Sequence, residues 1–390
     1  MKPTHPLIKI IVSVILWAML VFGVAIAARL MFCDAPLSHT NQSGAGMFEG
    51  QKALVTCLVR WDAIHYIQIV MIGYPSTYNL EGIRAFFPLY PLLLRWLLPL
   101  ASLITKEGLS ALLIVSLVIN VVSLIAGMHF LRKLFETDFG REGALLSALL
   151  VFLSPWAFFY LSIYTEAFFL FLSTAAFWAV IKKKWWLGAG LAALASATRL
   201  QGLFLLPCFL IEYLHDKKWQ LSKIKADVLW LALCPVGFFA YIRYLGGFQN
   251  YMEAYKKWPK RIFNPNILTP VINYFRRLWT GEIRPSEQTR CTLEETLCIM
   301  SVFIAFGLLV YAWKKLRPSY RFYTVVSLVV PLLTTIERGV GRYYTLIFPL
   351  YFAAAIFLSK RRVVLYGSIL ACAMFGALLI AGFTTGHFVG

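Results

Sequence analysis

The sequence segment with the clearest potential for chemistry is Arg60-Trp61-Asp62-Ala63-Ile64-His65-Tyr66. If this segment is helical, Asp62, His65 and Tyr66 share one face, because residues three and four apart are neighbours on a helix. A carboxylate beside an imidazole can exchange protons with a substrate as an acid–base pair. A solvated loop with an ordinary Asp and His fits the same spacing, so the segment alone leaves both interpretations open.

Other polar residues lie next to strongly apolar sequence. Ionisable groups at membrane depth are costly and are most often functional. With those of the first segment, the residues concerned are Asp34, Arg60, Asp62, His65, Tyr164, Glu166, Arg199, Gln201, Trp258, Arg261, Glu337, Arg338, Arg342 and Tyr343. If their loops lie on one side of the membrane, they converge as a site on a rigid scaffold does.

These residues also have structural explanations, which the sequence leaves open. Glu166 opens an apolar helix, where an acid favours the helix dipole. Arg199 could be a snorkelling or internally paired charge. The Arg342-Tyr343 pair could anchor a helix end at the interface, and the aromatic and basic residues around Trp258 could form an interfacial belt instead of binding an anionic headgroup.

Composition places the chain in a membrane. Of its 390 residues, 60% are hydrophobic and 14% are charged, and the mean hydropathy is +0.71. A soluble domain is nearer half apolar and a quarter charged. The first apolar run, Ile8 to Leu30, is too long for the core of a signal peptide and reads as a membrane helix. The sequence therefore predicts an all-α polytopic integral membrane protein that forms one domain over residues 1–390.

Basic residues predict the topology. The net charge is +19, and short clusters of Lys and Arg between apolar runs mark the cytoplasmic loops of membrane proteins. The clusters are Arg132/Lys133/Arg141, Lys182–Lys184, Lys217/Lys218/Lys223/Lys225, Lys314/Lys315/Arg317/Arg321 and Lys360–Arg362. No compact basic fold is available to bind nucleic acid, so nucleic acid is not an expected partner.

A helix needs about 20 apolar residues to cross the hydrocarbon. The clear candidates are 8–30, 109–131, 143–161, 166–181, 227–245, 294–313, 321–337, 343–359 and 363–383. All basic clusters become cytoplasmic under two conditions. Segment 85–105, which holds three prolines and Arg95, must not cross the membrane fully, and segment 185–214 must form a short helical hairpin. These conditions predict about eleven crossings, a cytoplasmic N-terminus and large outer loops at 31–108 and 246–292.

Soluble-enzyme motifs are missing from the sequence. We find no P-loop, HExxH motif, GxSxG motif, strand-linked GxGxxG or His/Cys metal box. Neither a metal nor another cofactor is therefore predicted. The seven Cys residues show no metal-ligand spacing, and the sequence leaves open whether Cys33 and Cys57 form a disulfide.

Several segments of the sequence form an ordered pattern. They are Arg60–Tyr66, Gly73-Tyr74, Ala85-Phe86-Phe87-Pro88-Leu89-Tyr90-Pro91, Tyr164-Thr165-Glu166, Thr198-Arg199-Leu200-Gln201-Gly202, Trp258 with Arg261, Arg342-Tyr343 and Phe348-Pro349-Leu350. Together these segments resemble the GPI mannosyltransferase 2 (PIG-V-type) family and its bacterial relatives. They follow the family's order from about residue 60 to 350. The stretch at 199–202 differs from the family's Arg-Ser-Asn-Gly at two of four positions.

The resemblance implies a GT-C glycosyltransferase fold, with interfacial helices in the first outer loop and an active site on the outer or lumenal face. It implies a polyprenyl-phosphate sugar donor, typically of mannose, a lipid- or glycan-linked acceptor, and inversion at the anomeric carbon. The family's catalytic carboxylate corresponds to Asp62, with Asp34 as the second candidate. The compact length and short Lys-rich loops favour a bacterial cytoplasmic membrane over the endoplasmic reticulum.

The expected roles follow from this resemblance and from side-chain chemistry. Asp62 is the expected general base, and His65 and Glu166 are expected to orient it or the acceptor. Arg199, Arg261 and Arg342 are the expected phosphate ligands, since Arg pairs bidentately with such oxygens. The other predicted substrate contacts are Arg60, Trp61, Tyr66, Tyr164, Gln201, Trp258 and Tyr343. A transporter or flippase of lipid-linked sugars is the alternative, because it would use the same polar pocket without chemistry.

Overall fold

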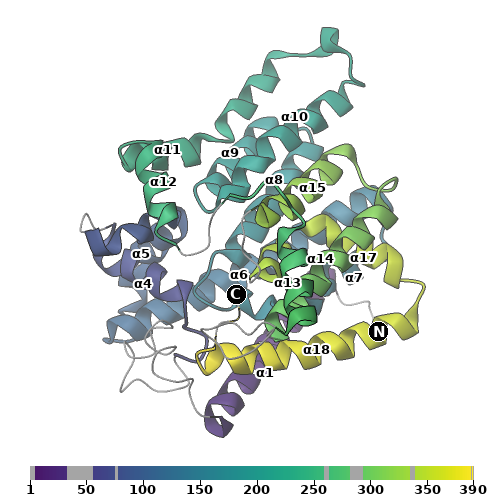
Figure 1. Ribbon diagram of the computed structural model, residues 1–390. Coiled ribbons are helices and arrows are strands. Elements are labelled where there is room, and N and C mark those ends of the chain that lie inside the picture. The colour runs from purple at the N-terminus through teal and green to yellow at the C-terminus, as the bar shows by residue number, and fades with distance from the viewer. Residues whose placement is uncertain are drawn as a thin grey trace.

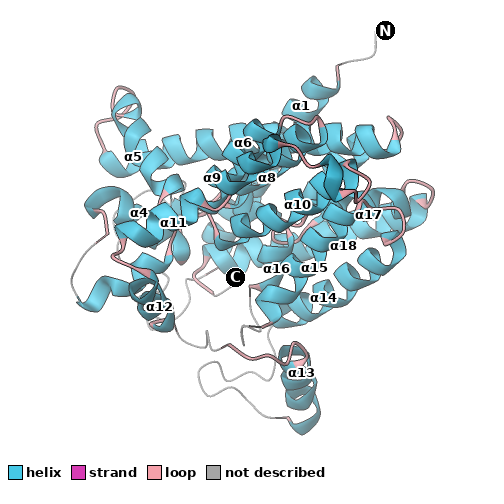
Figure 2. Ribbon diagram, turned by 90° about the horizontal axis from the view of Figure 1, so that it is seen from above, coloured by secondary structure: helices cyan, strands magenta, loops and turns pink. Residues whose placement is uncertain are grey.

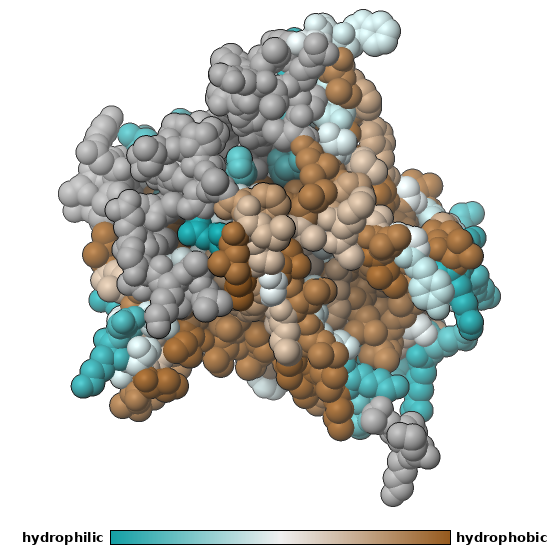
Figure 3. All heavy atoms as spheres, turned by 90° about the horizontal axis from the view of Figure 1, so that it is seen from below, coloured by the Kyte–Doolittle hydropathy of each residue, from teal (hydrophilic) through white to brown (hydrophobic). Residues whose placement is uncertain are grey.

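The computed structural model describes residues 5–32, 56–74, 78–258, 263–281, 293–333, 339–387 and 389. Over these residues the protein is built of helices and turns, without a strand (Figures 1 and 2). Seen from below, much of the surface is apolar, with hydrophilic residues toward the edges of this face (Figure 3). The predicted all-α membrane fold is confirmed.

Five helical segments of the described chain are long and apolar enough to cross a membrane. They are α1 (Pro6–Met31), α6 (Gly108–Phe139), the segment Ala226–Tyr244, α14 (Leu293–Ala312) and α18 (Arg362–Thr384). The segment Ala226–Tyr244 combines a 3₁₀ stretch, η7 (Ala226–Leu233), with α11 (Val236–Tyr244). Only 11% of the apolar window of α18 is buried within the protein, so most of this helix is available to lipid.

Shorter helices pack between the long ones and build the core. They are α7 (Ala144–Leu149), α8 (Glu166–Ile181), α9 (Trp185–Ser196), α10 (Leu205–Asp216), α15 (Pro318–Leu332) and α17 (Phe348–Leu358). Helix α8 lies against both α6 and α9, and most of its side chains are buried. This packing fixes the first residue of α8, Glu166, inside the protein.

Two of the ambiguous segments have the predicted form. Helix α5 (Leu89–Ala101) has 13 residues, a length of about 20 Å, which is too short to cross the hydrocarbon. Segment 185–214 is a hairpin of α9 and α10, joined through Arg199 and the 3₁₀ turn η5 (Leu200–Phe204). The turn closes tightly, because a Cβ at Gly202 would overlap the backbone of Ala195 and Ser196.

The structure differs from the predicted spans at two places. Segment 143–161 is not one helix: α7 ends at Leu149, and the 3₁₀ turns η3 (Leu150–Leu153) and η4 (Ala157–Tyr160) follow. Pro155 lies between these turns, where it lacks an N–H and disfavours helix at the preceding residue. Segment 343–359 is also broken, into α16 (Val340–Tyr344) and α17.

Further elements lie outside these core helices: α4 (Asp62–Ile72), the 3₁₀ helix η2 (Tyr78–Ala85), α12 (Phe248–Lys256) and α13 (Thr269–Thr280). In Figure 1, α4 and α12 lie at the left of the bundle, whereas α13 lies beside α14. Helix α4 packs against α5, while α12 packs against η2 and α11. The start of α4 and one face of α12 thereby face the ends of the core helices.

Candidate active site

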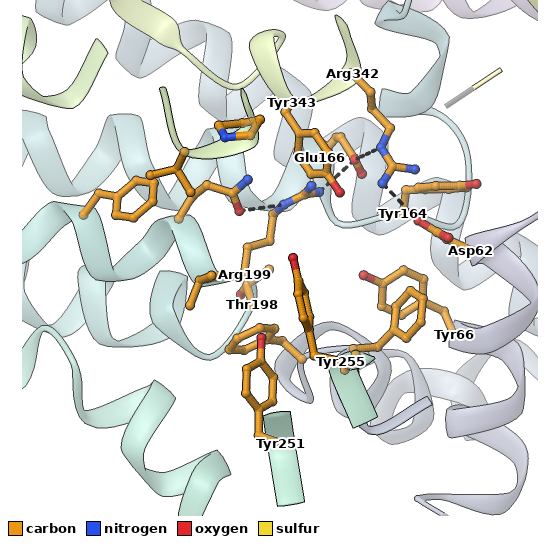
Figure 4. Close-up of a pocket in the computed structure, with 18 residues that line it drawn as sticks. Asp62, Tyr66, Tyr164, Glu166, Thr198, Arg199, Tyr251, Tyr255, Arg342 and Tyr343 are labelled. Carbon is orange, nitrogen blue, oxygen red and sulfur yellow. Dashed lines mark hydrogen bonds and ion pairs between the residues drawn. The ribbon is translucent and has the colours of Figure 1, made fainter. Parts of the chain in front are cut away.

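A pocket lies where the start of α4, the start of α8, the α9–α10 turn, α12 and α16 meet (Figure 4). Its volume is about 140 Å³, room for several water molecules at about 30 Å³ each. Charged side chains lie along one side, and Tyr66, Tyr251 and Tyr255 lie opposite them (Figure 4). The lining also includes Phe86, Phe87, Leu200, Phe204, Val330 and Pro331.

The charged side of the pocket holds two carboxylates and two guanidiniums. Arg342 Nη2 lies 3.0 Å from Asp62 Oδ2, and Arg342 Nε lies 3.2 Å from Glu166 Oε1. Arg199 Nη1 lies 2.8 Å from the same Glu166 oxygen. Glu166 is fully buried, whereas the Asp62 side chain is 19% exposed. The four charges balance, which is the condition under which a protein tolerates buried ions.

Aromatic rings fix the two guanidiniums. The Tyr343 ring lies between them, with its centroid 5.4 Å from Arg199 Cζ and 5.3 Å from Arg342 Cζ. Arg342 Cζ is also 5.1 Å from the centroid of the Tyr164 ring. Arg199 further donates hydrogen bonds to Thr165 Oγ1 at 2.8 Å and to Gln201 Oε1 at 3.4 Å. Such cation–π and hydrogen-bond contacts orient the guanidiniums toward the pocket.

Local sequence explains how these side chains are placed. Asp62 and Glu166 are the first residues of α4 and α8, where the helix dipole favours an anion. Stabilisation of the helix start alone does not account for Glu166, because its carboxylate also pairs with two arginines. No hydrogen bond links its carboxylate oxygens to a backbone N–H among the described residues.

Helix α16, which carries Arg342 and Tyr343, is held at its start. Gly339 adopts φ 81°, and its N–H donates to buried Glu294 Oε1 at 2.8 Å. A Cβ at Gly341 would overlap the Trp156 ring, so glycine is needed for α16 to pack there. These contacts set the position of Arg342 relative to Asp62.

The sequence profile of the mannosyltransferase (PIG-V) family matches residues 6–258. The chain belongs to this family. The matched part of this PIG-V family member includes Asp62, Glu166 and Arg199, whereas Arg342 and Tyr343 lie beyond it. The pocket therefore combines the matched part with the C-terminal helices.

Two curated relatives illustrate the similarity. GPI alpha-1,6-mannosyltransferase 2 of Mus musculus is 33% identical over 181 residues, which are 44% of this chain and 34% of the relative. The Rattus norvegicus protein of the same name is 36% identical over 159 residues, 39% of this chain and 31% of the relative. The matches thus span about a third of the length of these curated relatives.

Not every predicted site residue of this PIG-V family member lines the pocket. Asp62, Tyr66, Tyr164, Glu166, Arg199, Gln201, Arg342 and Tyr343 do. Arg60 and Trp61 do not line it, and their side chains donate hydrogen bonds to backbone carbonyls. Arg261 and the alternative carboxylate Asp34 lie outside the described residues, as do Glu337, Arg338 and Cys33, whose pairing with Cys57 the sequence left open.

His65 and Trp258 contact each other beside the pocket instead of lining it. His65 Nδ1 lies 3.3 Å from Gln68 Oε1, and the His65 ring centroid is 5.0 Å from that of Trp258. The Trp258 indole N–H donates to Gly82 O at 2.9 Å. Burial lowers the pKa of His65 below its usual value, against the opposing effect of the Asp62 charge. The predicted helix is present, but His65 points to the packed side of α4.

Three pocket residues had no predicted role of their own: Thr198, which appeared only as part of a family segment, and Tyr251 and Tyr255, for which an interfacial belt was the alternative to headgroup binding. Tyr251 and Tyr255 are four residues apart on α12, a spacing that places both on one face. That spacing could have indicated, from the sequence alone, that the two tyrosine rings face the same way. Phe86 and Phe87 belong to the segment that carries the family resemblance, but no chemistry marks them. In the described residues, no group of three His, Cys, Asp or Glu side chains is placed to hold a metal.

Proposed function

We propose that this PIG-V family member is a membrane glycosyltransferase that transfers mannose from a polyprenyl-phosphate donor to a hydroxyl of a lipid- or glycan-linked acceptor. Family membership supports mannosyl transfer, and the long apolar helices suit a lipid-linked substrate. The observation that carries the proposal is a partly exposed carboxylate, Asp62, beside the guanidiniums of Arg199 and Arg342 in one pocket. We place the reaction on the outer or lumenal face of a bacterial cytoplasmic membrane.

In the proposed reaction, Asp62 accepts the proton of the acceptor hydroxyl while that oxygen attacks the anomeric carbon. The bond between the anomeric carbon and the phosphate oxygen breaks on the opposite face, so the configuration inverts. The transition state resembles an oxocarbenium ion, as in other glycosyl transfers. The bonding electrons leave with the polyprenyl phosphate, which needs no proton at neutral pH.

The leaving phosphate needs its negative charge stabilised in the pocket. Arg199 and Arg342 are suited to this, because preorganised donors stabilise charge that develops in the transition state. Glu166 holds both guanidiniums through one carboxylate oxygen. The wall of Tyr66, Phe86 and Tyr255 offers an apolar surface for the first part of the prenyl chain.

The test is sugar transfer by the purified protein in detergent. Polyprenyl-phosphate mannose with a radiolabelled sugar is supplied with a membrane extract as the acceptor pool. Wild type should label a product, and Asp62→Asn should be about 10²- to 10⁴-fold slower, as is typical for loss of a general base. Asp216→Asn is the matched control, because Asp216 pairs with Lys183 outside the pocket.

Two outcomes would contradict the proposal. Full activity of Asp62→Asn would remove Asp62 as the base. If wild type binds the donor but transfers no sugar to any acceptor, a transporter or flippase of lipid-linked sugars becomes the better explanation. Translocation of the donor across vesicle membranes would then be measured.

A further inference from the structure

The residues just before Asp62 are bound to the far end of the chain. The guanidinium of Arg60, a residue only 2% exposed, donates to Thr384 O at 3.0 Å. The indole N–H of Trp61 donates to His387 O at 3.2 Å. Both carbonyls belong to the C-terminal end of α18 and the turn after it. Two consecutive side chains are thus attached to one helix end more than 300 residues away in the sequence.

Trp61 has a backbone conformation that needs external support. Its φ is 56° and its ψ is −119°, and it directly precedes the first residue of α4, Asp62. Positive φ is uncommon for a bulky side chain. Such a conformation costs about 1–3 kcal/mol and persists only where surrounding contacts determine it. The indole bond to His387 O is one of these contacts, so it helps to set the direction in which Asp62 enters the pocket.

The same helix end also supports the aromatic rings of the site. The Phe383 ring centroid lies 5.2 Å from those of Phe158 and Phe159. Phe159 packs in turn against Tyr164, with centroids 4.9 Å apart, and the Tyr164 hydroxyl donates to Arg60 O at 3.0 Å. Because Tyr164 also contacts the Arg342 guanidinium, the end of α18 supports both members of the Asp62–Arg342 pair.

We propose that the end of α18, from Phe383 to His387, is a positioning element that holds Asp62 through Arg60 and Trp61. It rests on the proposed function in so far as Asp62 is the base. The element lies beyond residues 6–258, which the family profile matches. Its action is geometric, because a displacement of about 1 Å caused by a change away from the chemistry can lower a rate about 100-fold.

Two variants remove the same contact from its two sides. Trp61→Phe keeps an aromatic ring but lacks the N–H, and a chain that stops at Gly386 lacks the His387 carbonyl. We expect kcat to fall about 10- to 100-fold in each, while the donor KM and the melting temperature stay near wild type. Trp279→Phe is the matched control, since this tryptophan is 92% exposed on α13.

The double variant tests whether the two changes act through one contact. Interacting residues give non-additive effects, whereas independent ones add. We therefore expect Trp61→Phe in the shortened chain to be no slower than the slower single variant. A double variant as slow as the product of both single effects would overturn the inference. So would wild-type kcat in Trp61→Phe.

A second measurement does not depend on turnover. Hydrogen exchange of the backbone amides from Thr56 to Ile64 should quicken in both single variants, while exchange in α8 stays unchanged. Unchanged exchange at 56–64 would overturn the positioning role. If wild type transfers no sugar at all, the exchange result still decides whether α18 orders this segment, so the two failures are distinguishable.

Discussion

Asp62 Oδ2 lies 3.0 Å from Arg342 Nη2, so the proposed base and a proposed phosphate ligand are paired with each other in the pocket. Of the two carboxylates in the pocket, Asp62 is the more exposed, because Glu166 is fully buried. A donor phosphate that approaches Arg342 therefore competes with Asp62. Its binding would release the carboxylate at the moment when a base is needed.

This competition predicts that Asp62→Asn binds polyprenyl phosphate more tightly than wild type although it transfers sugar much more slowly. An exposed ion pair contributes up to about 1 kcal/mol, and this pair is mostly buried, so we expect an affinity gain of about fivefold or more. Equilibrium binding of radiolabelled polyprenyl phosphate to the purified variants measures it. Asp216→Asn should bind as wild type does. Weaker binding by Asp62→Asn would show that Asp62 does not compete for Arg342.

Glu166→Gln should destabilise the fold strongly. The substitution leaves the Arg199 and Arg342 guanidiniums without the fully buried carboxylate that now faces both. Breaking a buried ion pair from one side costs about 3–5 kcal/mol. Thermal unfolding in detergent measures the loss. The double variant Glu166→Gln/Arg199→Gln should recover part of it, and a double variant less stable than Glu166→Gln alone would contradict this account.

Tyr255→Ala should weaken donor binding and leave the chemical step intact. The Tyr255 ring lies across the pocket from the charged residues (Figure 4). An aromatic contact contributes about 0.5–1.5 kcal/mol, so the donor KM should rise about 2- to 10-fold at nearly constant kcat. Tyr366→Ala is the control, because Tyr366 is 64% exposed on α18. A fall in kcat without a change in KM would place Tyr255 in the chemical step instead.

His65 should make the fold sensitive to mild acid. Burial lowers its pKa below the ordinary 6.5 in the folded protein, so the unfolded chain binds the proton first. Stability is therefore fully present above about pH 6.5 and declines as the pH falls below it. Melting temperatures between pH 5 and 7.5 measure this dependence. His65→Gln should flatten the curve relative to wild type, and a curve that keeps its slope in this variant would contradict the assignment to His65.

Much of the charged site could be predicted from the sequence. Glu166 and Arg199 stood out because each interrupts an apolar run, and ionisable residues in such places need partners. The basic clusters also predicted the hairpin of α9 and α10, which brings Arg199 to the start of α8. Charge and apolar length are properties of whole segments, so they can be recognised in a single sequence without knowing how individual side chains pack.

The direction of individual side chains could not be predicted in the same way. Helical spacing placed Asp62, His65 and Tyr66 on one face, but it could not say that His65 packs against Phe86 and Trp258 beside the pocket. Arg60 was expected to contact substrate because it belongs to the polar segment, Arg60–Tyr66, that carries the family resemblance. Its partners are backbone carbonyls, which no sequence pattern identifies. The break at Pro155 did carry a local signal, because proline disfavours helix at the preceding residue, but the prediction of one span over 143–161 rested on apolar length.

Most of the length of helix α18 is accessible to lipid, whereas its C-terminal end contacts Arg60 and Trp61 inside the protein, just before Asp62. Its 23 residues make it about 35 Å long, against a hydrocarbon thickness of about 30 Å. A helix longer than the hydrocarbon tilts, and the tilt changes with bilayer thickness. If the end of α18 positions Asp62 as proposed, the alignment of Asp62 depends on the acyl-chain length of the surrounding lipids, and thin and thick membranes should support different transfer rates.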